Sequence, residues 1–110
     1  MKLPNPERAV VDVVKLRDYV LNSEHPRGRH KARVFAAKLG FAAGDAEAVR
    51  AMLLRAAVDY DAVPGKQDRY GRRYAVEFTM GGPAGLATVR SLWIVRRGED
   101  FPRLASCYVL

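Results

Sequence analysis

The stretch RYAVEFTMGGPAGLATVRSLWIV, residues 73–95, decides the fold class of this chain because apolar side chains recur in it at every second position. In its first half these side chains are Tyr74, Val76, Phe78 and Met80. A period of two is typical of a β-strand that is buried on one face only. The glycines and proline at 81–85 predict a turn, and residues 86–95 continue as a second strand rich in β-branched and aromatic side chains. The stretch therefore predicts an antiparallel hairpin.

The chain after this hairpin predicts one further strand. Residues 97–100 form a turn signal, and residues 103–110 follow as a terminal strand. Alternation within that strand predicts that Leu104, Ser106 and Tyr108 share one face. Alternation within the hairpin places Trp93 on the face opposite to Arg90, which predicts that Trp93 belongs to the core rather than to a ligand site.

Three helices are predicted before the hairpin. Residues 13–21 follow a capping aspartate at position 12, residues 30–39 end at Gly40, and residues 46–59 follow a second capping aspartate at position 45. Each of these segments has apolar residues at helical spacing. The stripes are Val13, Leu16 and Val20, then Ala32, Phe35, Ala36 and Leu39, then Ala46, Val49, Leu53, Ala56 and Ala57.

Helices in one half of a chain and strands in the other are typical of an α+β domain. We expect a single domain over residues 1–110, with a helical half over about 12–60 and a strand meander over about 62–110. Its three N-terminal helices are expected to pack on one face of an antiparallel sheet of three to four strands. The other face of the sheet would then be open to a ligand.

Composition indicates a folded domain and bears on membrane association, disulfides and metal binding. The chain has 110 residues, of which 49% are hydrophobic and 28% are charged, a mixture typical of a folded domain. Prolines at positions 4 and 6 and the lack of a long apolar window predict a soluble, cytoplasmic protein without a membrane partner. The single Cys107 excludes an internal disulfide. Two histidines without a matching carboxylate motif predict no metal and no cofactor.

The net charge of +7 is concentrated in two segments, 27–40 and 62–75. The first carries five lysines or arginines and no acid, and the second holds the cluster Lys66, Arg69, Arg72 and Arg73. A surface of one sign attracts an anionic partner, so RNA or another polyanion is the expected ligand. Arg69, Tyr70 and Arg72 are candidate RNA-binding residues because a base can stack on the tyrosine ring. Alternatively, both segments are solvated faces that keep the protein in solution.

The first basic segment supplies most of the candidate site residues. His30 would lie at a helix start, where free backbone N–H groups attract a phosphate and a neutral imidazole can act as a general base. Lys31 and Arg33 would stabilise phosphate charge beside it. The preceding loop adds the candidate phosphate-binding or RNA-binding residues His25, Arg27 and Arg29. The alternative is that both histidines are ordinary loop or helix-start residues.

The sheet supplies the second group of candidates. Thr88 and Arg90 share a strand face, and Ser106 joins them if its strand is a neighbour. An arginine fork matches phosphate geometry and a hydroxyl can donate to a phosphoryl oxygen. The candidate catalytic residues are therefore His30, Arg90 and Ser106, with Thr88 as a binding residue. The alternatives are that Arg90 pairs with Glu77 across the hairpin and that Ser106 only fills its strand.

Short motifs spread over almost the whole chain carry a resemblance. They are Leu3-Pro4-Asn5, Lys15-Leu16-Arg17-Asp18-Tyr19, Leu21-Asn22, His25-Pro26, Gly28, His30-Lys31-Ala32-Arg33-Val34-Phe35, Leu39-Gly40, Asp68-Arg69-Tyr70-Gly71, Trp93-Ile94 and Pro102-Arg103-Leu104. Together they resemble a bacterial domain of unknown function found in small stand-alone proteins and C-terminal toxin modules. This resemblance implies a place in toxin and antitoxin systems.

The order of helices and strands, with its basic and hydroxyl residues, is also distantly similar to the barnase, EndoU, colicin and RelE ribonuclease superfamily. That similarity implies an acid/base or phosphate-binding role for His30 and Lys31 on a helix. It implies that Arg90 and Ser106 act from the sheet. The chain lacks the histidine pair at the spacing that is diagnostic of an EndoU-like site.

Three functions are compatible with these residues. The first is a metal-independent endoribonuclease of toxin type, in which the 2′-hydroxyl of RNA attacks the adjacent phosphate. The second is a non-catalytic module that binds nucleic acid or an acidic partner through its basic surface. The third is an interaction protein whose open sheet face binds a small acidic antitoxin-like protein. The first requires His30 and Arg90 to lie within reach of one phosphate, with Ser106 near them.

Overall fold

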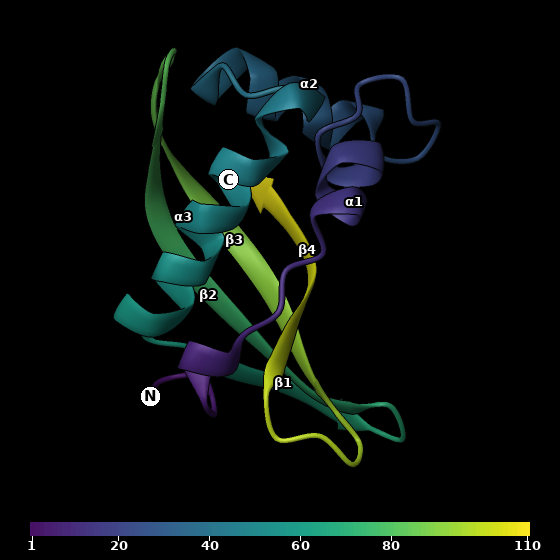
Figure 1. Ribbon diagram of the computed structural model, residues 1–110, viewed down its shortest axis with the longest axis vertical. Coiled ribbons are helices and arrows are strands. Elements are labelled where there is room, and N and C mark those ends of the chain that lie inside the picture. Colours follow the sequence, from purple (N-terminus) through teal and green to yellow (C-terminus); the bar gives the residue numbers. More distant parts are fainter.

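The computed structural model describes residues 1–110 (Figure 1). Its helical elements are η1 (Pro6–Arg8), α1 (Val13–Lys15), η2 (Leu16–Val20), α2 (Arg29–Leu39), η3 (Ala43–Asp45) and α3 (Ala46–Asp59). Its strands are β1 (Val63–Asp68), β2 (Gly71–Gly82), β3 (Gly85–Arg96) and β4 (Pro102–Val109). The strands form one antiparallel sheet in the order β1-β2-β3-β4. This arrangement confirms the α+β class and gives the sheet four strands.

The hairpin that decides the fold class lies where the sequence predicts it. β2 and β3 pair without a break from Gly71 opposite Arg96 to Gly82 opposite Gly85. Alternate side chains of β2 are buried, as the period of two predicts. We call the sheet face that carries these buried side chains the inner face, and the opposite one the outer face.

Strand β1 does not follow from the apolar pattern. It contains Pro64 and Gly65, residue types that are depleted in strands. A proline is tolerated at the edge of a sheet, where its missing N–H leaves no neighbour unpaired. β1 is such an edge strand, and its register with β2 shifts between Pro64 and Gln67.

Strand β4 carries an irregularity that overturns one prediction. Ser106 and Leu104 pair with consecutive residues of β3, so Ala105 is an extra residue in β4. Such a β-bulge shifts the alternation of side chains by one position. Leu104 therefore lies on the inner face with Trp93, whereas Ser106 lies on the outer face with Tyr108. The prediction that Leu104 shares a face with Ser106 and Tyr108 is wrong.

The first predicted helix has a different geometry from the expected α-helix over 13–21. α1 is a short α-helical turn, and η2 continues it as a π-helical turn in which the N–H of Leu21 donates to the carbonyl of Leu16 at 2.8 Å. The wider turn brings Leu16, Val20 and Leu21 onto the buried side together. Burial of these three side chains accounts for the departure from α-helical spacing.

The other two helices agree closely with their predictions. α2 ends at Gly40, whose φ of 78° is left-handed, and its predicted stripe is buried except at Ala36. All five predicted stripe residues of α3 are buried. Asp45 precedes α3 without capping it, because its carboxylate accepts the N–H of Ala42 at 2.9 Å and closes η3 instead. None of the helices has the length and apolar character needed to cross a bilayer.

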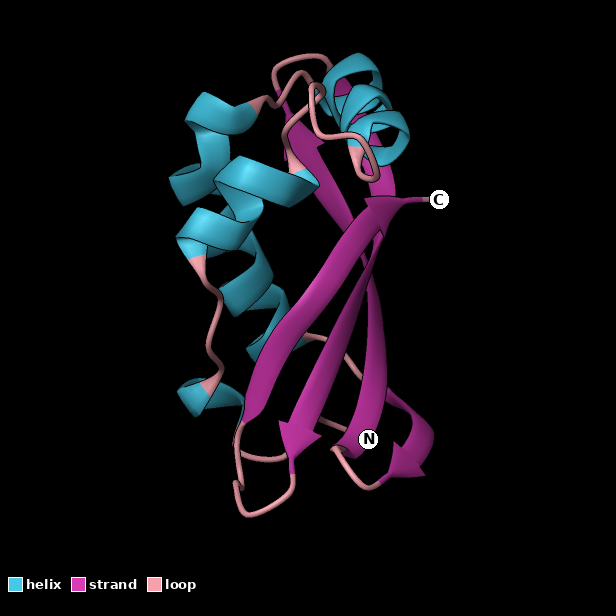
Figure 2. Ribbon diagram, turned by 90° about the vertical axis from the view of Figure 1, so that its right-hand side faces the viewer, coloured by secondary structure: helices cyan, strands magenta, loops and turns pink.

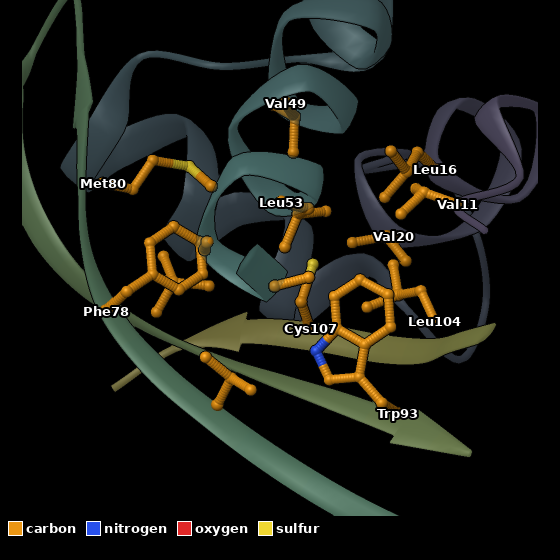
Figure 3. Packing of buried hydrophobic residues seen from close by; sticks show 14 of the residues in the cluster. Val11, Leu16, Val20, Val49, Leu53, Phe78, Met80, Trp93, Leu104 and Cys107 are labelled. Atoms are coloured by element: carbon orange, nitrogen blue, oxygen red, sulfur yellow. The ribbon is translucent and has the colours of Figure 1, made fainter. Parts of the chain in front are cut away.

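One hydrophobic cluster joins side chains of the helical half to the inner face of the sheet (Figure 3). Val49 and Leu53 of α3 belong to it, as does Trp93, which is 1% exposed. The indole N–H donates to the hydroxyl of Ser91 at 2.9 Å, and that hydroxyl donates to the carbonyl of Val76 at 2.8 Å. The polar atoms that enter the core are thus paired. The prediction that Trp93 is a core residue is confirmed.

The helices gather along one side and at one end of the twisted sheet (Figure 2). α2 contacts both β3 and β4. An extended segment around residue 10 runs beside β4, where the N–H of Val10 donates to the carbonyl of Pro102 and its carbonyl accepts from the N–H of Leu104, both at 2.9 Å. This segment therefore covers part of the backbone edge that β4 would otherwise expose.

Burial of Cys107 gives a test of the core. Burial raises the pKa of this thiol from 9.0 to about 12, although nearby Lys15 opposes the shift. Between these values only the unfolded chain loses the thiol proton, so the free energy of unfolding should fall by up to about 1.4 kcal/mol per pH unit. The measurement is urea unfolding from pH 8 upward, with Cys107→Ala as the reference. Equal slopes for the two proteins would contradict the prediction.

Candidate anion site on the outer sheet face

Arg90 lies between two polar side chains on the outer face. The strand registers place Glu77 opposite Arg90 on β2 and Tyr108 opposite it on β4. The guanidinium donates to Oε2 of Glu77 from Nη2 at 3.1 Å and from Nε at 3.3 Å. It also donates from Nη1 to the Tyr108 hydroxyl at 3.2 Å. We call these three residues the arginine rung; its pairing of Arg90 with Glu77 is the one the hairpin spacing suggested.

Helix α2 adds a fourth group to the arginine rung. The Lys31 ammonium lies 4.7 Å from the centroid of the Tyr108 ring. The guanidinium carbon of Arg90 lies 5.9 Å from the same centroid. Both cations are within reach of a cation–π interaction with this ring. A lysine of the helical half and an arginine of the sheet therefore meet at one tyrosine.

The arginine rung combines positive charge with a proton acceptor. Hydrogen bonds to Tyr108 and Glu77 raise the pKa of Arg90 above its ordinary value, so the guanidinium stays charged. The side chains of Arg90 and Glu77 are 37% and 48% exposed, so both are open to solvent. The groups gathered around Tyr108 are two cations, a phenol hydroxyl and a carboxylate, of which the cations and the hydroxyl can donate to a phosphate. No three His, Cys, Asp or Glu side chains lie together in a way that could hold a metal ion.

His30 lies near the start of α2, as predicted, but not on its packed side. At about 100° per residue, the positions of Ala32 and Phe35 in the buried stripe turn His30 to the opposite side of the helix. His30 is exposed, and so is Arg33, which also lies away from the stripe. Lys31 flanks the stripe, which explains why this residue reaches the sheet. The structure thus joins Lys31, rather than His30, to Arg90.

His25 shapes the loop before α2. Its Nδ1 accepts the backbone N–H groups of Arg27 at 3.1 Å and Gly28 at 3.2 Å. Its ring stacks at a tilt on Tyr19, with 4.4 Å between the centroids. A side chain at position 28 would meet the carbonyl of Tyr19 at 2.8 Å, so the loop also needs a glycine there. Arg27 and Arg29 are exposed on either side of this glycine.

Replacing His25 tests this loop role. His25→Ala leaves two N–H groups without their acceptor, and we expect the free energy of unfolding to fall by about 1 kcal/mol. His30→Ala is the matched control, because the exposed side chain of His30 makes no hydrogen bond and its loss should leave stability unchanged. Urea unfolding of both variants measures the difference. Equal stabilities would show that the Nδ1 contacts do not hold the loop.

Ser106 and Thr88 lie on the outer face, on either side of the arginine rung. Thr88 is two residues before Arg90 on β3 and is exposed. Ser106 pairs with Leu92, two residues after Arg90, so it is diagonal to the guanidinium rather than opposite it. The three predicted sheet residues thus share a face. The side chains that contact Arg90 directly are those of Tyr108 and Glu77.

The second basic cluster lies at the other end of the sheet. Arg69 and Tyr70 form the turn between β1 and β2, where the guanidinium donates to the phenol oxygen at 2.9 Å. Arg72 has the inward parity of Tyr74, with its guanidinium carbon 6.0 Å from that ring, and donates to Gln67. The structure therefore does not bring Arg69, Tyr70 and Arg72 to the arginine rung.

Sequence reasoning did not assign Tyr108 to the site and considered Glu77 only as an ion-pair partner. The available signal was alternation: Tyr108 has the same parity as Ser106 in the last strand. The position of Tyr108 beside Arg90 depends on the strand order, which a single sequence leaves open.

The sequence pattern of one domain family matches residues 2–110. That family is described as a domain of unknown function, DUF6883. The chain belongs to the DUF6883 family. The predicted resemblance to a bacterial domain of unknown function is thereby confirmed. No curated protein matches this DUF6883 chain significantly.

The fold is similar to that of a chain in a solved complex from Klebsiella pneumoniae 342. The complex is described as a contact-dependent growth inhibition toxin and immunity protein. The TM-score is 0.67 at 22% sequence identity, and the match covers 92% of this DUF6883 chain and 99% of the other. At this identity the likeness establishes a shared fold.

Proposed function

We propose that this DUF6883 chain is a metal-independent endoribonuclease of toxin type that acts on RNA phosphodiesters. The supporting observation is the meeting of Lys31 and Arg90 at the Tyr108 ring. Two cations so placed can bind one phosphate, and the carboxylate of Glu77 is beside them to take a proton. In this proposal the helices cover the inner face, the outer face receives RNA, and the protein acts in the cytoplasm.

Glu77 is the general base of the proposed reaction. Its carboxylate accepts the proton of a 2′-hydroxyl, whose oxygen forms a bond to the adjacent phosphorus. Arg90 and Lys31 stabilise the charge that develops on the phosphoryl oxygens. The Tyr108 hydroxyl gives its proton to the 5′-oxygen as the bond from phosphorus to that oxygen breaks. Exchange through water then returns a proton to Tyr108 and removes the one that Glu77 accepted. The products are a 2′,3′-cyclic phosphate and a 5′-hydroxyl.

The other candidates take supporting positions in this proposal. Thr88 and Ser106 flank the arginine rung and orient the phosphate from either side. Arg27, Arg29 and Arg33 are exposed around the start of α2 and attract RNA through their charge. His25, Arg69, Tyr70 and Arg72 lie away from the reacting phosphate. His30 is the alternative base.

The test is incubation of the purified chain with labelled RNA in EDTA. Glu77→Gln keeps the shape of the side chain and removes the base, so we expect cleavage to slow by about 10²-fold. His30→Ala should stay within about twofold of the wild-type rate, because His30 faces away from Arg90. Purification of Glu77→Gln by the same route controls for contaminating nucleases.

Each outcome of this experiment is informative. If cleavage persists in Glu77→Gln and is lost in His30→Ala, the general base is His30 on α2 and not Glu77. No cleavage of any RNA would contradict the enzyme proposal itself. A 2′,3′-cyclic phosphate on the upstream product would support attack by the 2′-hydroxyl, whereas a 5′-phosphate on the downstream product would contradict it.

A non-catalytic binding module is the second candidate function, and the ion pair of Arg90 with Glu77 favours it. A guanidinium held by a carboxylate is a stable element of a sheet without any substrate. Such a module would bind RNA or a small acidic protein, and the complex that contains the similar fold supports a protein partner. RNA binding without scission that weakens steeply between about 50 and 200 mM salt would indicate this function.

A further inference from the structure

The outer face of the sheet alternates charged and apolar rungs. Along β2 and β3 the side chains on this face recur every two residues. From the arginine rung toward the β1–β2 turn, the next rung is Ala75, Leu92 and Ser106, and the one after it contains Arg73, Ile94 and Arg103. Four residues of a strand span about 13 Å, so two groups of cations lie about that far apart with an apolar rung between them.

The apolar rung forms the floor of a hollow. This apolar hollow has a volume of about 340 Å³, and its lining includes Val63, Ala75, Leu92, Ala105 and, at one end, Arg73. The volume lies at the small end of the range for ligand pockets. Apolar side chains on the floor offer a surface for the flat face of a nucleobase without selecting one base by hydrogen bonds.

A second hollow of about 340 Å³ continues from the apolar one, and Arg73 lines both. This basic hollow is also lined by Lys15, Arg96 and Arg103. Arg73 is paired with Asp68 and Arg103 with Glu99, both at 2.9 Å. Lys15 and Arg96 form no ion pair, so the basic hollow keeps a net positive charge. Its charge complements an anionic group such as a phosphate rather than a basic or apolar one.

We propose that the outer face binds single-stranded RNA over consecutive nucleotides: one phosphate at the arginine rung, a nucleobase in the apolar hollow, and a following phosphate in the basic hollow. This inference rests on the proposed function, because it extends the substrate from the same site. The base must leave a helical stack to enter the hollow, so the substrate is unpaired RNA. Binding is tolerant of sequence, because stacking rather than base-edge recognition holds the nucleotide.

The test uses fluorescently labelled 2′-O-methyl oligonucleotides of two and eight nucleotides, which cannot undergo attack by a 2′-hydroxyl. Fluorescence anisotropy should show the octanucleotide binding at least about tenfold more tightly than the dinucleotide. Arg96→Ala should remove most of this advantage and lower the salt slope by about one. Arg97→Ala is the matched control, because Arg97 is the exposed next residue, has the same charge and does not line the basic hollow.

The apolar hollow has its own pair of variants. Leu92→Glu places a carboxylate in the hollow and should weaken octanucleotide binding at least about tenfold. Leu86→Glu makes the same change on the same strand face at the hairpin tip, where Leu86 is 75% exposed, and should have little effect. Melting temperatures establish that both variants fold. If Leu92→Glu does not fold, the Arg96 and Arg97 pair still decides the proposal.

The outcomes separate this inference from the proposed function. Equal losses in Arg96→Ala and Arg97→Ala would indicate diffuse attraction and overturn the inference. Unchanged oligonucleotide binding in Arg96→Ala and Leu92→Glu would also overturn it and leave this face for a protein partner. A chain that binds the octanucleotide as expected but cleaves no RNA contradicts only the catalytic proposal. Length-independent binding by a chain that does cleave RNA contradicts only the inference.

Discussion

Arg90→Ala is expected to slow RNA cleavage by about 10²–10³-fold, the usual effect of losing one preorganised donor to a developing negative charge. Arg90 is the only arginine of the rung and offers two N–H groups of a planar fork to one phosphate. The ammonium of Lys31 supplies a point charge and cannot replace that geometry. The measurement is the initial rate on labelled RNA in EDTA under saturating substrate.

Two further variants make this expectation specific. Arg55→Ala removes an equally charged, ion-paired arginine from α3, where its side chain is 81% exposed, and should leave the rate unchanged. Arg90→Lys keeps the charge and loses the fork, so its rate should lie between those of Arg90→Ala and the wild type. A fully active Arg90→Lys would contradict the role of the fork. A fully active Arg90→Ala that folds normally would remove the arginine rung from catalysis.

Trp93→Ala is expected to lower the free energy of unfolding by about 3–5 kcal/mol. The indole is 1% exposed and lies in the cluster that joins the helical half to the inner face of the sheet. Its removal leaves a large cavity between layers that cannot easily collapse onto it. Urea unfolding followed by circular dichroism measures the loss. A loss below about 1 kcal/mol would show that the two halves do not depend on this contact.

Ser91→Ala separates the polar part of this contact from the packing. It leaves the indole N–H buried without an acceptor, at an expected cost of about 1–3 kcal/mol. Ser106→Ala is the matched control, because Ser106 lies on the outer face and its hydroxyl makes no hydrogen bond within the chain. Equal effects of the two serine substitutions would contradict the role assigned to the hydroxyl of Ser91.

Local sequence determines most of the elements of this fold. The hairpin follows from alternation within β2 and β3 and from the turn between them, because both signals lie within a few neighbouring residues. The stripe and glycine stop of α2 and the five buried positions of α3 follow in the same way. Strand β1 is not predicted by these local signals, because Pro64 and Gly65 are residue types that disfavour strands. The edge of a sheet tolerates them all the same.

The candidate site likewise has some features that local sequence indicates and others that it does not. Sequence alone identifies a basic helix start and an arginine on a strand face, and it offers the pairing of Arg90 with Glu77 as an alternative, since each depends on spacing within one element or one hairpin. It leads to His30 as the helical partner because histidine has the chemistry of a general base. The apolar stripe of the same helix places His30 on the opposite side, but it does not show that Lys31, beside the stripe, reaches the sheet.

Only the tertiary structure decides which helical residue reaches the sheet. Packing of the stripe around Phe35 into the core fixes the rotation of α2, and that rotation brings Lys31 to Tyr108 while His30 turns outward. The bulge at Ala105 likewise depends on how β4 fits against β3. Both features result from contacts between segments far apart in the chain, whose energies depend on the whole core and on no local pattern.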